Sequence, residues 1–163
     1  TPGISSAASD VYKRQVIKML RFFLTLLTTL MLILSTASYA REDAIAIVKE
    51  RKDLFKKSQQ DIKALYSSIR SGELENVKTK AIALAKWGAV MPNYFPEGSG
   101  GGVSEASAEI WKDFEGFKEA ANSFELAALS VVDATDQDVK EAIISAAKSV
   151  SNSCKSCHRK FRN

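Results

Sequence analysis

The chain has 163 residues, of which 45% are hydrophobic and 26% charged, and its formal net charge is +4 at pH 7. Four of its 23 basic residues and one of its 19 acidic residues precede position 41, so the remainder is close to neutral. This distribution gives no indication of a nucleic-acid-binding protein. The chain has two cysteines, so it cannot form a framework of several disulfides.

Residues 1–18 precede a methionine at position 19, are rich in serine and alanine, and show no sustained periodicity. We interpret them as a non-native leader that takes no part in the fold.

Residues 19–40 have the three parts of a secretory signal peptide. Arg21 gives a basic start, an apolar run extends from Phe22 to Leu34, and small residues precede Ala40. The run is short for a membrane-spanning helix, which needs about 20 apolar residues, so cleavage after Ala40 is favoured over a membrane anchor. The signal predicts export to the periplasm.

Residues 41–163 form the predicted mature domain, in which apolar residues recur every three or four positions, as is typical of amphipathic helices. The first helix is predicted over 42–70 and ends at Ser71-Gly72. The second is predicted over 73–90. Met91-Pro92 ends it, because a proline disfavours helical conformation in the residue that precedes it.

A glycine-rich loop at 92–102 is too irregular for a phosphate-binding motif. The third helix is predicted over 105–130. The fourth is predicted to begin near Thr135, which can cap it, with Asp138 at the positive end of the dipole, and to reach about Phe161. Four amphipathic helices with mostly short connections predict an all-α fold, an antiparallel four-helix bundle.

The segment 154–158, CKSCH, contains both cysteines and the only histidine. C-x-x-C-H is the attachment signature of c-type haem. Cys154 and Cys157 would form thioethers to the two vinyl groups, and His158 would be the axial ligand of the iron. The sequence therefore predicts one covalently held haem c per chain, near the C-terminus.

Other sites use similar residues. A redox C-x-x-C usually opens a helix, where the dipole lowers the thiol pKa. A structural zinc site needs four ligands, and this segment offers three. A disulfide across the short loop is the remaining alternative. Cys154 and Cys157 share the core-facing stripe of the predicted fourth helix with Val150 and Phe161, which favours an apolar cofactor held between helices.

Across residues 41–163 the sequence resembles the cytochrome c′ family. The resemblance is carried by the exported four-helix pattern, by C-x-x-C-H in the last turns of the fourth helix, and by the segment VKERKDLF at 48–55. The stretch DIKAL at 61–65 and the FPEG loop at 95–98 also look like the family.

The resemblance implies roles for side chains outside the attachment motif. Arg51 matches an arginine that lies near a haem propionate, and Phe55 matches the residue over the distal face of the iron. Arg162, four residues after His158, matches a basic residue beside the proximal ligand. Trp87 is expected to pack at an interface or near the haem edge.

A low-spin electron carrier needs a second strong iron ligand, usually Met or His. The mature region has no second histidine, and its only methionine is Met91. Because Phe55 cannot ligate iron, we expect five-coordinate high-spin iron held by His158 alone, under an apolar distal face without a hydrogen-bond donor. Six-coordinate low-spin iron, with Met91 or a lysine as the sixth ligand, is the alternative.

The resemblance implies a periplasmic haem protein, not an enzyme, that transfers electrons, binds diatomic gases such as NO or CO, or does both. A thiol-disulfide oxidoreductase using Cys154 and Cys157 is the alternative from another class, and a structural bundle with one disulfide is a third.

The expected partners are haem, a diatomic gas, a redox protein and a second copy of the chain bound through the first two helices. Neither nucleic acid nor, after signal cleavage, a membrane is expected. A basic cluster around the attachment motif suggests either a solvated helix end or docking of an acidic redox partner. The cluster comprises Lys155, Arg159, Lys160 and Arg162.

Overall fold

The structure is a computed structural model that describes the backbone of residues 6–102 and 104–163. It describes the side chains of residues 15, 16, 18–28, 31, 42, 44–102 and 104–163. The chain divides into two compact units, residues 1–43 and 44–163.

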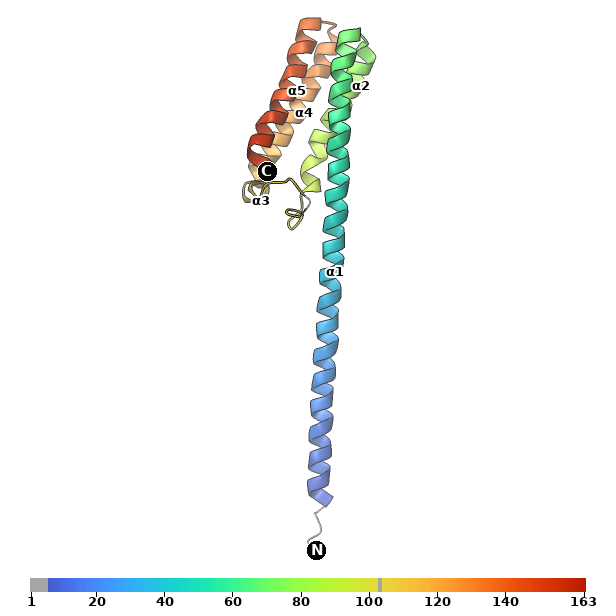
Figure 1. Ribbon diagram of the computed structural model, residues 1–163, viewed down its shortest axis with the longest axis vertical. Coiled ribbons are helices and arrows are strands. Elements are labelled where there is room, and N and C mark those ends of the chain that lie inside the picture. Colours follow the sequence, from blue (N-terminus) through green and yellow to red (C-terminus); the bar gives the residue numbers. More distant parts are fainter. Residues whose placement is uncertain (1–5, 103) are drawn as a thin grey trace. The chain divides into compact units, whose positions relative to one another are not determined.

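The first helix, α1, runs from Ser6 to Ser71 and so begins well before the predicted start at position 42 (Figure 1). No glycine or proline occurs between positions 4 and 71, so nothing in this stretch interrupts a helix. The predicted leader and signal peptide lie in the first unit, and their removal stays a prediction. None of the described helices combines the length and apolarity needed to cross a membrane.

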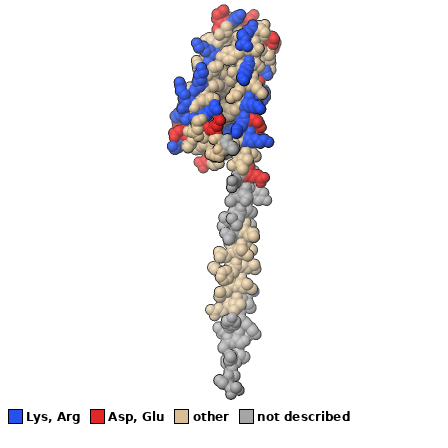
Figure 2. Space-filling model, viewed as in Figure 1, with Lys and Arg blue, Asp and Glu red and all other residues tan. Residues whose placement is uncertain are grey.

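The second unit contains the last turns of α1 and the rest of the helices. These are α2 (Leu74–Val90), the 3₁₀ helix η1 (Met91–Tyr94), α3 (Glu109–Lys112), α4 (Phe114–Asp136) and α5 (Lys140–Phe161). Long helices run in alternating directions, and α4 lies beside both α2 and α5 (Figure 1). The expected all-α, antiparallel four-helix bundle is confirmed. Charged side chains are spread over the face that Figure 2 shows.

The turn between α1 and α2 lies where the sequence predicts it. Gly72 has a φ of +78°, a conformation that favours glycine, and the amide of Glu73 donates to the carbonyl of Ser68 at 3.0 Å. The sequence predicts that helical structure ends at Met91-Pro92. Instead, these two residues begin the 3₁₀ helix η1, which continues the chain in helical form to Tyr94.

The third predicted helix is divided into two. Asp113 leaves helical conformation (φ −131°, ψ 62°), and its carboxylate accepts a hydrogen bond from the amide of Gly116 at 3.0 Å, which caps α4. The apolar spacing continues through this break, so periodicity alone predicted one helix. Helix α4 also extends past Ser130, where the third helix was predicted to end, and reaches Asp136.

The predicted cap of the fourth helix is wrong. Thr135 is buried inside α4, where its hydroxyl donates to the carbonyl of Val131 at 2.7 Å. Asp138 forms the turn with a φ of +52°, and α5 begins at Lys140. The predicted end of α5 at Phe161 is confirmed.

Two contacts hold α2 in the bundle. Gly88 faces α4 so closely that a Cβ atom there would lie 2.9 Å from Cβ and 3.0 Å from Cα of Glu125. Against α1, the buried carboxylate of Asp61 accepts from Nζ of Lys57 at 3.1 Å and from Nζ of Lys80 on α2 at 3.0 Å. Burial raises the pKa of Asp61, but the two lysines outweigh it and hold that pKa below its usual value.

Gly88→Ala should lower the free energy of unfolding by about 1–3 kcal/mol, because the added methyl meets the backbone of α4, which cannot move aside. At an open helix position the same change would stabilise by about 1 kcal/mol. Urea unfolding measures the sign of the change in the free energy of unfolding. Ala89→Gly, on the exposed face of α2, is the control that measures helix propensity alone. A stabilised Gly88→Ala protein would contradict the close approach of α2 and α4.

Because the pKa of Asp61 is lowered in the folded state, its ion pairs stabilise the fold at pH values above the unfolded-state pKa of about 3.9. This stabilisation is lost as the pH falls towards the folded-state pKa. Asp61→Asn should therefore lose stability near pH 7 and show a weaker dependence on pH below about 4. Urea unfolding at both pH values tests this. Asp53→Asn, on an exposed residue of the same helix, is the control, and an equal acid response in both variants would contradict the prediction.

Candidate functional site

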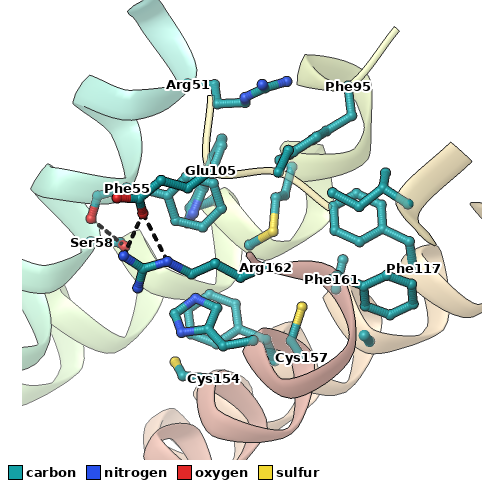
Figure 3. A pocket seen from close by; sticks show the side chains of 18 of the residues that line it. Arg51, Phe55, Ser58, Phe95, Glu105, Phe117, Cys154, Cys157, Phe161 and Arg162 are labelled. Carbon is teal, nitrogen blue, oxygen red and sulfur yellow. Dashed lines mark hydrogen bonds and ion pairs between the residues drawn. The ribbon is translucent and has the colours of Figure 1, made fainter. Parts of the chain in front are cut away.

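A cavity of about 360 Å³ lies among α1, α2, α4 and α5 of the second unit (Figure 3). Most of its lining is apolar or aromatic. From outside the attachment motif, the lining includes Phe55, Ile62, Trp87, Phe117, Phe124 and Phe161.

All three chemical groups of the C-x-x-C-H motif line this cavity. The helical repeat of α5 places Cys154 and Cys157 on the face that carries the buried Val150 and Phe161. Both cysteines are half-buried with free thiols, and both lie on α5 at the base of the view in Figure 3. His158 also lines the cavity while remaining exposed, so the cavity reaches solvent beside it.

The two thiols are poorly suited to redox exchange. Burial raises the pKa of Cys154, and burial together with the neighbouring Cys154 raises the pKa of Cys157 to about 11. A thiol-disulfide oxidoreductase depends instead on a thiolate formed at low pKa. The environment therefore counts against that alternative.

The imidazole of His158 is kept neutral. Burial lowers its pKa, the positive charge of Arg162 lowers it further, and Glu105 partly opposes both. Neutral imidazole is the form that binds a metal.

Arg51 is buried, with 3% of its surface exposed, and lines the cavity. Its guanidinium donates to the carbonyl of Tyr94 at 3.1 Å, to the hydroxyl and carbonyl of Ser99 at 3.0 and 2.7 Å, and to the hydroxyl of Ser104 at 2.6 Å. It also lies 4.3 Å from the ring centre of Phe95. All of these groups are neutral, and no described acidic side chain pairs with Arg51, so its charge is uncompensated.

The ring of Phe55 lies between two other aromatic side chains. Its centre is 5.2 Å from that of Trp87, edge to face, and 6.4 Å from that of Phe95. The indole nitrogen of Trp87 is buried and has no hydrogen-bond partner among the residues that the structure describes. The expectation that this side of the cavity lacks a hydrogen-bond donor is therefore incomplete, because an indole N–H belongs to a residue of its lining.

Met91 is buried and lines the same cavity as His158. The short η1 turn brings it there from the end of α2. The alternative of a methionine as sixth iron ligand therefore stays open, as does a lysine, since Lys52 and Lys56 also belong to the lining.

Arg162 lines the cavity together with His158. Its amide donates to the carbonyl of His158 at 3.2 Å, and its Nε donates to the carboxylate of Glu105 at 2.8 Å (Figure 3). The amide of Asn163 donates to the carbonyl of Glu105 at 3.0 Å, so the end of the chain is tied to the segment before α3.

The residues present fit a c-type haem. The attachment needs two thiols and an adjacent imidazole, which this lining supplies. A flat apolar macrocycle suits the aromatic walls, and its carboxylates suit the uncompensated cation of Arg51. The cluster around Arg51 was only partly visible in the sequence, because Ser99 lies in the glycine-rich loop, Ser104 lies just after it, and neither carries a motif.

Comparison with known proteins agrees with this fit. The family model described as Cytochrome C' matches residues 46–162. A cytochrome c' of Rhodospirillum rubrum is 33% identical over 133 residues, which are 79% of this chain and 90% of the relative.

Solved structures show the same fold. A nitric oxide complex of a mutant cytochrome c prime from Alcaligenes xylosoxidans has a TM-score of 0.66 at 23% identity, covering 74% of this chain and 95% of that one. A cytochrome c' described as having a ligand-controlled dimer dissociation has a TM-score of 0.68 at 19% identity, covering 73% and 95%. From its sequence match and its fold, the chain belongs to the cytochrome c′ family, whose members bind c-type haem.

Proposed function

We propose that this chain is a periplasmic haem protein with five-coordinate iron that transfers electrons and binds NO or CO. One observation carries the proposal: both cysteines and the only histidine line a single cavity whose lining also contains Phe55, an aromatic side chain that cannot ligate iron.

Each residue has a defined role in this proposal. Cys154 and Cys157 would hold the haem through thioether bonds, and His158 would ligate its iron. Arg51 pairs with a propionate, which supplies the negative charge that the surrounding neutral acceptors lack. Bound haem supplies an iron that exchanges one electron and accepts a small neutral ligand.

Arg162 has a supporting role beside His158. Its ion pair with Glu105 and its bond to the His158 carbonyl hold the last turn of α5 in place. Together with burial, its charge keeps the imidazole unprotonated and available to a metal.

Phe55 acts as the gate on the distal side. Its ring is packed by Trp87 and Phe95, so a gas reaches the iron only when the ring moves. A mutant of the related Alcaligenes xylosoxidans protein has been solved as a nitric oxide complex, and we extend nitric oxide binding to this chain on the shared fold.

Export and pairing complete the proposal. Removal of residues 19–40 would release residues 41–163 into the periplasm, where thiols can be joined to haem outside the cytoplasm. A second copy would bind through α1 and α2, where Ile45, Ile82 and Val90 leave apolar surface exposed. The related protein with ligand-controlled dimer dissociation supports such a pairing.

The purified exported protein should be red, with a high-spin absorption spectrum that changes when CO or NO is added to the reduced form. Met91→Leu should leave the resting spectrum unchanged, because the proposal gives Met91 no role as a ligand. A sharp low-spin spectrum that becomes high-spin in Met91→Leu would assign the sixth position to this methionine. A colourless protein would overturn the haem assignment.

Phe55→Val should accelerate CO binding to the reduced protein by about tenfold, equivalent to lowering the barrier by about 1.4 kcal/mol, because the smaller side chain leaves the distal side open. Flash photolysis or stopped-flow mixing measures the rate. Phe114→Val is the matched control, since Phe114 is half-buried and lies outside the cavity lining. Equal rates in both variants would show that Phe55 is not the gate.

A further inference from the structure

Charge is distributed unevenly over the helices of the second unit. Helix α4 carries five acidic residues and one lysine, whereas α5 carries five lysines or arginines and one glutamate. The part of α1 in this unit carries seven lysines or arginines and three acidic residues. In the view of Figure 2, Lys and Arg side chains gather over α5 and α1.

Two hydrogen bonds identify the sides on which α1 and α5 meet. The hydroxyl of Tyr66 on α1 donates to the carbonyl of Ala147 on α5 at 2.9 Å and lies 2.9 Å from the hydroxyl of Ser151. Lys148 and Lys155, three residues before and four after Ser151, therefore share the side of α5 that faces α1.

The same reasoning applies to α1. Lys63 precedes Tyr66 by three residues, and Lys56 lies two further turns towards the N-terminus on that side. Arg159 follows Lys155 by one turn of α5. These exposed side chains form one surface, which we call the basic face. It comprises Lys56, Lys63, Lys148, Lys155 and Arg159.

The cations of the basic face differ from most others in the unit. Seven ion pairs hold described lysines and arginines elsewhere, such as Lys160 with Asp113 and Lys118 with Glu115. None of the five basic-face side chains takes part in an ion pair with a described acidic residue. No ion pair with a described acidic residue therefore offsets these five charges, which remain available to attract an anion.

The basic face borders the cavity. Lys56 lines the cavity from α1, and the exposed His158 lines it from α5, between Lys155 and Arg159 in sequence. A partner seated on this face would therefore lie beside the exposed edge of the cavity.

We propose that the basic face is the docking site for an acidic protein that exchanges one electron with this chain. This inference rests on the proposed haem function and names its partner class. One electron passes from the iron of the reduced chain to a one-electron centre of the partner; no bond forms or breaks, and no proton moves. The charges steer the encounter and orient it, so the rate depends on ionic strength.

The test uses the reduced holoprotein and two small oxidants of opposite charge, hexacyanoferrate(III) and hexaammineruthenium(III). The rate with the anion should fall about tenfold as ionic strength rises from about 0.01 M to about 1 M, over which the Debye length shortens from about 30 Å to about 3 Å. The rate with the cation should not fall. Poly-L-glutamate should slow the reaction with the anion at low salt.

Two variants of equal net charge locate the effect. Lys56→Gln/Lys155→Gln/Arg159→Gln should lose most of the salt dependence with the anion. Lys86→Gln/Lys112→Gln/Lys118→Gln removes the same charge outside the basic face and should retain it. An equal loss in both would show that net charge acts without a docking site and would overturn the inference.

Two further outcomes separate the possibilities. A red, reducible protein whose rates ignore oxidant charge would overturn the docking site while leaving the haem function intact, whereas a colourless protein would remove both. If vesicles of anionic phospholipid bind through the same three residues and oxidant charge has no effect, the face belongs to a membrane surface and the acidic protein partner is excluded.

Discussion

The structure depends on one constraint: five consecutive residues must present two thiols and one imidazole to the same rigid group. Only a continuous helix does this at the end of α5, because its repeat turns Cys154 and Cys157 inward beside Phe161 while His158 lies at the edge of the cavity. The other helices then have to leave room beside that turn. Aromatic side chains on α1, α2 and α4 form the walls, so the core is divided between ordinary helix packing and the cavity lining.

A buried arginine organises the loop that covers one side of this cavity. Arg51 supplies four hydrogen bonds to groups between Tyr94 and Ser104, a stretch with glycines and little regular structure of its own. Burying a cation is unfavourable unless its charge is balanced, and the protein groups around it are neutral dipoles. The loop is thus ordered by an interaction whose charge balance requires a negatively charged group, which the proposed haem propionate provides.

Much of the site could be predicted because its chemical groups are adjacent in the chain. The spacing of Cys154, Cys157 and His158 and the helical period of their neighbours are both local properties. The partners of Arg51 come from residues 43 to 53 positions away, and the lone indole N–H of Trp87 depends on packing against α1, so neither has a local signal. The break at Asp113 was missed for a related reason, since the apolar spacing runs through it and only the cap reveals it.

The charge arrangement carries a cost in stability. Like charges four residues apart on a helix destabilise it by about 0.2–0.5 kcal/mol per pair, and Lys155 with Arg159 has this spacing. Elsewhere the chain does the opposite, pairing Glu115 with Lys118 along α4. Acidic residues are plentiful on α4, so the excess of cations on α1 and α5 follows from placement and not from composition. Cations that lie beside the exposed edge of the cavity and pair with no described acidic residue match negative charge that arrives from another molecule.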